Sequence, residues 1–146
     1  MPLRLKELVQ AAKANIKEVS CKEAQELLKC GYKALDVREA AEYLDGTIPM
    51  AVHIPRGMLE PVCDTQYACH KGEMSDLDQG WVVFCLAGGR GALAADTLQK
   101  MGYTHVVNLA GGFTAWKEAG GAISVPPIEN GLMRCDHPWN PGFQQG

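Results

Sequence analysis

The sequence lacks a long apolar run, a strong net charge and any internal repeat. No apolar stretch among its 146 residues approaches the ~20 residues that a membrane-spanning helix needs. Its formal net charge of −3 gives none of the basic footprint that nucleic acid attracts. These absences argue against three classes: a membrane protein, a nucleic-acid-binding protein and a repeat array.

The sequence also lacks a regular cysteine framework. Its six cysteines are irregularly spaced, and no two form a CxxC pair. With 47% hydrophobic and 21% charged residues, the composition is that of an ordinary globular protein, and the length fits one domain with an adequate core. The charged, helix-like residues 1–7 do not resemble a signal peptide. We therefore expect a cytoplasmic protein that does not depend on disulfides.

The most informative stretch is WVVFCLAGGRGALAADTL at residues 81–98. Four consecutive large apolar residues, 81–84, end at a glycine-rich break, as is typical of a parallel strand covered on both faces. Alanine-rich helix formers follow, and Gly102 suits the position just after a last helical turn. The pattern predicts a buried strand, a six-residue loop from Cys85 to Arg90, and then a helix.

Cys85 stands where this unit favours an anionic sulfur. It leaves the carboxyl end of a strand and faces a helix N-terminus, where unpaired N–H groups and the helix dipole are positive. Gly88 and Gly89 let successive N–H groups converge on one point, and Arg90 adds a permanent cation. Such a cradle stabilises a thiolate. A cysteine in isolation is more often structural, but this setting indicates that Cys85 is a nucleophile.

The loop CLAGGR at residues 85–90 resembles the active-site loop of the rhodanese (sulfurtransferase) domain family. Three further segments resemble the other signatures of that family in the same order: ALDVRE at 34–39, YLDGTIPMAVHIP at 43–55 and NLAGGFTAW at 108–116. The resemblance is specific because four separated motifs agree. It implies an α/β fold, with a central parallel β-sheet of about five strands and helices on both faces.

Two positions depart from the pattern of the family. Thr47 stands where the family commonly has histidine, and Met50 stands where it commonly has glycine. We therefore expect the turn at these positions to differ locally. Neither residue belongs to the loop of Cys85.

The chain is expected to have three parts. Residues 1–15 contain an amphipathic helix that we expect to cap the domain, with an oligomer contact as the alternative. Residues 16–122 are expected to form the rhodanese-like domain. Residues 123–146 are rich in Pro, Gly and Asn and lack periodicity, which predicts an extended C-terminal tail.

Asp36, Arg38 and Arg56 are the candidates to line the site besides the loop. The carboxyl ends of parallel strands share one sheet edge with the ligand crevice, so residues that follow these strands are expected near Cys85. Asp36 and Arg38 either shape the charge of the site or form a structural ion pair or turn cap. Arg38 and Arg56 are candidates to bring positive charge to a donor. His53 has the chemistry of a general base, but inside an apolar strand it is more typical of a core residue.

The irregular segment 57–80 is expected to be a long loop in which specificity resides. A zinc site there would need more than Cys63, Cys69 and His70 of this loop, and Cys135 and His137 in the tail are candidates to complete four ligands. Because paired CxxC spacing is missing, we expect no metal. A second cysteine that resolves a persulfide on Cys85 is another interpretation, and it leaves the roles of Cys63, Cys69 and Cys135 open.

These features predict a single-domain sulfurtransferase with no metal or organic cofactor. The Cys85 thiolate attacks the outer sulfur of thiosulfate or of a persulfide-carrying protein. The resulting persulfide anion is held by the N–H groups of the loop, which comprises Leu86, Ala87, Gly88, Gly89 and Arg90. A thiol, or cyanide in an assay, then accepts the sulfur. Neither nucleic acid nor a membrane is an expected partner. The apolar middle of the loop suits a protein persulfide better than the thiosulfate dianion.

Two alternatives belong to other function classes. Phosphatases and arsenate reductases of related fold use Cys-x5-Arg, whereas only four residues separate Cys85 from Arg90 here, which contracts the cradle toward one sulfur atom. The loop also lacks an acidic group to protonate a leaving alkoxide. A non-catalytic binding or regulatory module of the same fold is the second alternative, and such modules typically lack the cysteine.

Overall fold

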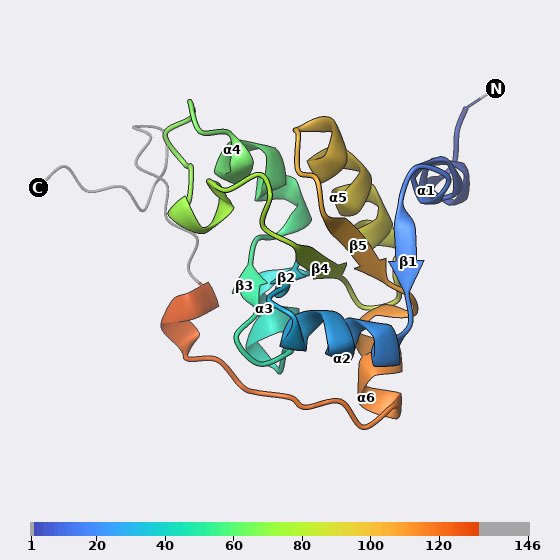
Figure 1. Cartoon of the computed structure of the whole chain (residues 1–146), viewed down its shortest axis with the longest axis vertical. Coiled ribbons are helices and arrows are strands. Elements are labelled where there is room, and N and C mark those ends of the chain that lie inside the picture. The colour runs from blue at the N-terminus through green and yellow to red at the C-terminus, as the bar shows by residue number, and fades with distance from the viewer. Residues whose placement is uncertain (1, 132–146) are drawn as a thin grey trace, which may run out of the picture.

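A five-stranded parallel β-sheet lies at the centre of the computed structural model, which describes residues 2–131 (Figure 1). The order of the strands across the sheet is β1-β5-β4-β2-β3. Their bounds are Lys17–Val19 for β1, Lys33–Asp36 for β2, Val52–His53 for β3, Trp81–Phe84 for β4 and Val106–Leu109 for β5. The predicted α/β class with a parallel sheet of five strands is confirmed.

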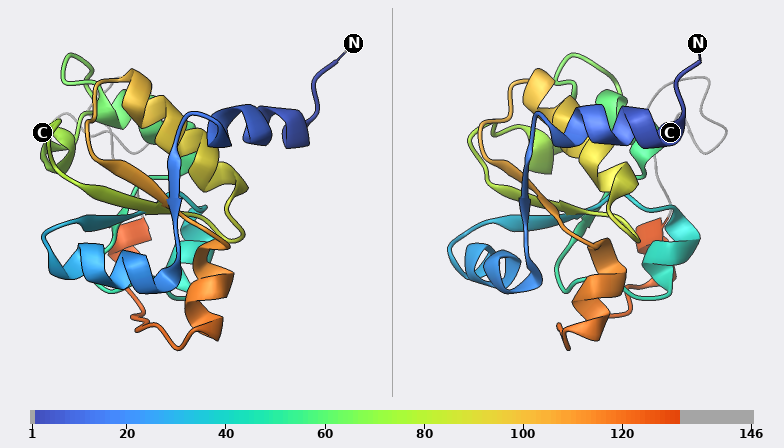
Figure 2. Two further views of the ribbon diagram at one scale, coloured as in Figure 1. Left: turned by 45° about the vertical axis from the view of Figure 1, so that its right-hand side comes forward. Right: turned by 90° about the vertical axis from the view of Figure 1, so that its right-hand side faces the viewer.

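Helices cover both faces of this sheet (Figures 1 and 2). The α-helices are α1 (Leu5–Lys13), α2 (Cys21–Lys29), α3 (Ala40–Leu44), α4 (Leu59–Cys63), α5 (Gly89–Lys100) and α6 (Gly112–Glu118). The 3-10 turns are η1 (Arg56–Met58), η2 (Gly72–Met74) and η3 (Ile128–Gly131). Helices α4 and α5 contribute to one hydrophobic cluster, and α2 and α6 contribute to the other.

Strand β4 explains why the run at residues 81–84 is wholly apolar. Trp81 and Val83 belong to the cluster under α4 and α5, whereas Val82 and Phe84 belong to the cluster under α2 and α6. Successive side chains of a strand point to opposite faces, so a strand covered on both faces has no polar position. This central strand therefore delivers the residue that follows it, Cys85, to the middle of the carboxyl edge of the sheet.

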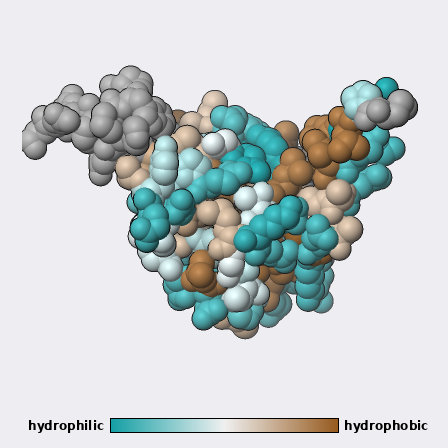
Figure 3. Space-filling model, turned by 90° about the horizontal axis from the view of Figure 1, so that it is seen from above, coloured by the Kyte–Doolittle hydropathy of each residue, from teal (hydrophilic) through white to brown (hydrophobic). Residues whose placement is uncertain are grey.

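The N-terminal helix α1 projects from the rest of the protein and packs against α5 (Figure 2). Near their contact, a Cβ atom built on Gly89 would lie 3.5 Å from Cγ2 of Val9. Toward its N-terminal end, α1 leaves Leu5 and Leu8 exposed, and Figure 3 shows hydrophobic side chains gathered on this projecting part. No helix within residues 2–131 is long and apolar enough to cross a bilayer.

Two segments have more structure than their sequence indicates. Segment 57–80 is not one irregular loop, because it contains most of η1, then α4 and η2, and it buries Leu59, Val62 and Met74. Beyond residue 122, Ser124 exchanges two backbone hydrogen bonds of 2.9 Å with Thr47, and η3 follows. The rest of the expected tail, residues 132–146, lies outside the described residues.

Candidate active site

Cys85 directly follows β4, and only 1% of the residue is exposed. The backbone N–H of Gly88 donates a hydrogen bond to its Sγ at 3.0 Å. Gly88 has a φ of 117°, in the left-handed region that favours glycine, and this bend turns its amide toward the sulfur. Cys85 therefore sits in a tight turn with a backbone donor aimed at its sulfur.

The loop is shorter than the predicted six residues. The carbonyl of Gly88 accepts the N–H of Ala92 at 2.9 Å, so helical hydrogen bonding begins at once and α5 starts at Gly89. Arg90 consequently belongs to the first turn of α5 and not to the loop. The short loop places Cys85 beside the N-terminus of a 12-residue helix, where the helix dipole favours a negative charge.

Two backbone N–H groups of helix α6 bind the carbonyl groups of the loop. The N–H of Phe113 donates to the carbonyl of Cys85 at 2.7 Å, and the N–H of Thr114 donates to that of Leu86 at 3.1 Å. Gly112 permits this approach, because a Cβ there would lie 2.5 Å from the oxygen of Cys85 and 2.6 Å from that of Leu86. The motif at 108–116 thus holds the loop of Cys85 through its backbone.

Asn108 connects the loop to the edge strand. Its buried side-chain amide donates to the carbonyl of Gly88 at 3.1 Å and to the carboxylate of Glu18 in β1 at 3.0 Å. We did not single out Asn108 from the sequence. The available signal was a polar side chain inside the otherwise apolar strand β5.

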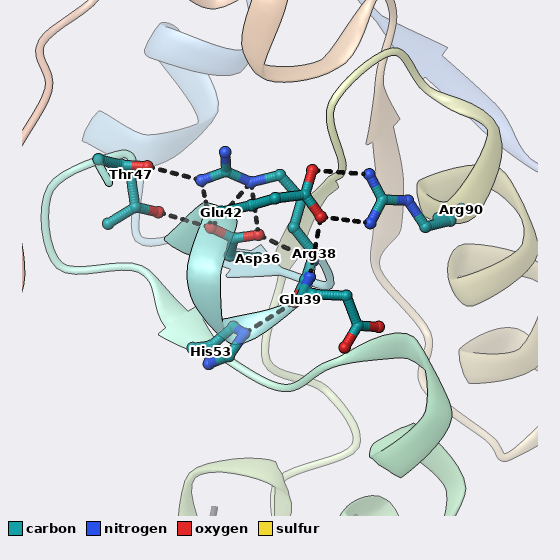
Figure 4. Close-up of polar contacts among 8 residues, drawn as sticks. Asp36, Arg38, Glu39, Glu42, Thr47, His53 and Arg90 are labelled. Carbon is teal, nitrogen blue, oxygen red and sulfur yellow. Dashed lines mark hydrogen bonds and ion pairs between the residues drawn. The ribbon is translucent and has the colours of Figure 1, made fainter. Parts of the chain in front are cut away.

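Asp36 and Arg38 form a buried ion pair beside this loop (Figure 4). Nε and Nη2 of Arg38 donate to the Asp36 carboxylate at 3.0 and 2.8 Å. Thr47 donates its hydroxyl to Asp36 at 2.8 Å, and the carbonyl of Gly46 accepts from Arg38 at 2.6 Å. The guanidinium also lies 4.3 Å from the ring centre of Phe113. The charge of Arg38 is therefore already compensated.

His53 is buried and lies below this pair in the view of Figure 4. Its Nε2 lies 2.8 Å from the carbonyl oxygen of Arg38, and its ring stacks on Tyr43 with centroids 4.2 Å apart. Burial lowers the pKa of His53, and the Arg38 carbonyl and the Asp36 charge oppose that change. The geometry is that of a packed, hydrogen-bonded core residue.

Arg90 forms a bidentate ion pair with Glu42 of α3 (Figure 4). Its two terminal nitrogens donate to the two carboxylate oxygens at 2.7 and 3.0 Å. The hydrogen bond from Arg90 lowers the pKa of Glu42, and Glu42 raises the pKa of Arg90. Sequence reasoning missed Glu42, because a carboxylate in a short helix carries no signal of a partner 48 residues away.

A pocket of about 430 Å³ opens between α3 and α6, beside the residue that follows Cys85. It is lined by Arg38, Glu42, Asp45, Gly46, Leu86, Phe113, Thr114, Lys117 and Glu118. Arg56 is not among these residues. Its guanidinium instead donates to Glu60 at 2.9 Å and to Thr97 of α5 at 3.1 Å.

The other cysteines within residues 2–131 do not line this pocket. Cys63 is buried, and burial raises the pKa of its thiol to about 11. Cys69 is buried and disulfide-bonded, which differs from our expectation that the cysteines are not in disulfides. Within residues 2–131, no group of three or more His, Cys, Asp or Glu side chains could hold a metal ion. Cys135 and His137 lie outside the described residues.

Residues 20–119 match the rhodanese-like domain. The mitochondrial protein HIGH ARSENIC CONTENT 1 of Arabidopsis thaliana is 32% identical over 116 residues, which cover 77% of this chain and 69% of that protein. The human thiosulfate:glutathione sulfurtransferase is 35% identical over 108 residues, which cover 68% and 92% of the two chains. A solved Rhodopseudomonas palustris protein of unknown function, described as a possible tyrosine phosphatase, is 36% identical with a TM-score of 0.77, covering 85% of this chain and 99% of its own.

Proposed function

Since the chain belongs to the rhodanese-like domain family, we propose that it is a sulfurtransferase that carries a sulfane sulfur on Cys85. The observation that carries the proposal is the hydrogen bond of 3.0 Å from the Gly88 amide to the Cys85 sulfur, at the N-terminus of α5. A backbone donor and a helix dipole both stabilise negative charge at that position. They favour the thiolate needed for attack and the persulfide anion that results from it.

In the loading step, the Cys85 thiolate attacks the outer sulfur of the donor. With thiosulfate, a sulfur–sulfur bond forms to Cys85, the sulfur–sulfur bond of the donor breaks, and sulfite leaves with the electron pair. With an organic persulfide, the thiolate of the carrier leaves instead. The N–H groups at the start of α5 then hold the Cys85 persulfide. No metal or organic cofactor takes part in this proposal.

In the unloading step, a thiol or cyanide attacks the outer sulfur, and the Cys85 thiolate is regenerated. The pocket supports this use because it is lined by Leu86, the residue that directly follows Cys85. Leu86 itself is 45% exposed, so the apolar rim of the pocket can contact the carrier of a donor or acceptor sulfur. We infer that Cys85, the short loop after it and the first turn of α5, together residues 85–90, form the catalytic segment, with Asp36 and Arg38 supporting it.

Intact-protein mass spectrometry tests this function. After incubation of the full chain with thiosulfate or an organic persulfide, the wild type should gain about 32 Da, the mass of one sulfur atom, and cyanide should remove it. Cys85→Ser should gain nothing, whereas Cys30→Ser, which changes an exposed free thiol, should load like the wild type. If neither donor loads Cys85, the chain is a non-catalytic module and the proposal is wrong.

A phosphatase is the second candidate, since one similar structure is described as a possible tyrosine phosphatase. The pairing of Arg90 argues against it, because both terminal nitrogens that would bind a phosphate are held by Glu42. The same argument applies to arsenate reduction, which needs a comparable oxyanion site. Release of phosphate from an aryl phosphate, lost in Cys85→Ser, would support the phosphatase in place of the sulfurtransferase.

A further inference from the structure

We propose that Glu42 determines which donors the site accepts, by cancelling the charge of Arg90 and so disfavouring dianionic donors relative to those of lower charge. This inference rests on the proposed sulfurtransferase function. It names the chemical class of the preferred donor, an organic sulfane sulfur compound with at most one negative charge near the reacting atoms. The charge that matters is that of the cation closest in sequence to Cys85.

Arg90 is that cation among residues 85–90, and Glu42 takes up both of its terminal nitrogens at 2.7 and 3.0 Å. Figure 4 shows the two planar groups facing each other across the gap between α3 and α5. The negative charge of Cys85 also raises the pKa of Arg90, after the larger effect of Glu42. The guanidinium belongs to the first turn of the helix that starts beside Cys85, and its charge is already compensated by Glu42.

Arg90 is not among the residues that line the pocket, and the charges of that lining do not take the place of its paired charge. Arg38 is bound to Asp36 in a pair that is almost wholly buried. Lys117 is the other cation of the lining, against the three carboxylates of Glu42, Asp45 and Glu118. A donor that enters the pocket thus meets an environment without excess positive charge.

The charge near the reacting atoms affects the loading rate because the donors differ in their own negative charge. Thiosulfate carries two negative charges, so its attack by a thiolate brings three negative charges together before sulfite leaves. A methanethiosulfonate anion has the same kind of terminal sulfur but one charge, and it leaves as methanesulfinate. Its attack brings only two negative charges together. Unlike charges stabilise such an encounter and like charges oppose it, most strongly where the site is partly buried.

The Glu42→Gln variant tests the proposal with little change of shape. In the wild type, Oε1 of Glu42 accepts the backbone N–H of Glu39 at 3.1 Å, and a glutamine can keep that bond through its side-chain oxygen. It cannot neutralise Arg90. We expect the ratio of loading rates, thiosulfate over methanethiosulfonate, to rise about three- to tenfold at low salt. The gain should shrink when salt is raised to about 0.5 M, because partly exposed charges are screened.

Two further variants separate the role of this pair from a general change of charge. Glu118→Gln removes an exposed carboxylate from the same pocket without freeing Arg90, so it should change the ratio less than Glu42→Gln does. The Glu42→Gln/Arg90→Gln double variant should lose the gain. An equal effect of Glu118→Gln, a gain that persists without Arg90, or an unchanged ratio in Glu42→Gln would each overturn the proposal.

The same experiment distinguishes this proposal from the function on which it rests. If wild-type Cys85 is loaded by neither thiosulfate nor methanethiosulfonate nor an organic persulfide, the sulfurtransferase itself is wrong. If all three donors load Cys85 but Glu42→Gln leaves their ratio unchanged, the function stands and only the role of Glu42 is refuted.

Discussion

Asn108 is coupled to the sulfur of Cys85 through a single residue. Its side-chain amide lies 3.1 Å from the carbonyl oxygen of Gly88, and the N–H of the same glycine lies 3.0 Å from Cys85 Sγ. The carbonyl and the amide of Gly88 flank one Cα atom in the left-handed conformation. Fixing the carbonyl therefore fixes the direction in which the amide points. We therefore expect Asn108 to affect the proposed reaction by positioning the Gly88 amide and not by contact with a substrate.

We predict that Asn108→Ala both destabilises the protein and slows the loading of Cys85. Removal of the amide deletes its hydrogen bonds to Gly88 and Glu18, while Gly88 keeps the bond from Ala92. At about 0.5–1.5 kcal/mol for each lost bond, the free energy of unfolding should fall by about 1–3 kcal/mol. The loading rate should fall about three- to tenfold, because the Gly88 amide is no longer held in place. Urea unfolding and mass-resolved sulfur loading measure the two effects.

Asn15→Ala is the matched control for this prediction. It removes the same side chain from an exposed site, where the amide donates to Asp96 at 3.3 Å. Its cost should be about 0.5 kcal/mol or less, with no change in loading, because surface substitutions rarely exceed that range. Equal loading rates in Asn108→Ala and the wild type would refute the positioning role of Asn108.

We predict that replacing Met50 with glycine stabilises the folded protein. It adopts a φ of 65° and is 95% exposed, so the strained backbone is not compensated by burial of its side chain. Glycine has no Cβ to oppose this conformation, and the relief exceeds the entropy that it adds to the unfolded chain. Met50→Gly should raise the free energy of unfolding by about 0.5–1 kcal/mol. Met50→Ala, which keeps the strain, should not, and a stability of Met50→Gly at or below that of wild type would contradict the argument.

We predict that His53 makes the protein less stable as the pH falls below neutrality. Because burial lowers its pKa below the ordinary value of 6.5, the unfolded chain takes up a proton at His53 before the folded protein does. The contribution of His53 to stability is therefore complete above the unfolded pKa and is lost as pH falls toward the folded one. The free energy of unfolding should fall more steeply in the wild type than in His53→Gln between about pH 7 and pH 5. Parallel curves for the two proteins, from urea unfolding at each pH, would refute this assignment.

The sequence was sufficient for the parts of the molecule that are local or periodic. The apolar run at 81–84 predicts a central strand because both of its faces are covered, and the glycine-rich break after it predicts the turn at Cys85. The predicted end of that turn at Arg90 is wrong, because the carbonyl of Gly88 already accepts the first helical hydrogen bond. Element ends depend on one or two hydrogen bonds, which a residue pattern does not specify.

Contacts between distant segments could not be predicted from the sequence. Glu42 meets Arg90 because α3 and the start of α5 follow neighbouring strands at the same sheet edge. Arg56 also follows a strand at that edge, yet its side chain runs toward α5 and away from the lining of the pocket. The topology brings Glu42 and Arg56 to the same edge of the sheet. Side-chain packing then decides that Glu42 lines the pocket and Arg56 does not.

We predict that the stability of the protein depends on the pairing of Asp36 with Arg38 more than on the presence of either charge. Both side chains are buried, and the pair is enclosed by Thr47, the carbonyl of Gly46 and the ring of Phe113. Arg38→Met removes the cation but fills much of its volume. It leaves the carboxylate of Asp36 buried without its partner, which costs about 3–5 kcal/mol.

The double variant Asp36→Asn/Arg38→Met should recover part of that loss, because it removes the uncompensated charge as well. A buried ion pair gains little over neutral groups of similar shape, since desolvation offsets most of the attraction between its charges. Arg38→Lys should not substitute for arginine, because a lysine cannot bond Asp36 and Gly46 in the same planar arrangement. Urea unfolding of the wild type and these three variants measures the differences. If the double variant is less stable than Arg38→Met alone, Asp36 is held by Thr47 and its other neighbours and not by the charge of Arg38.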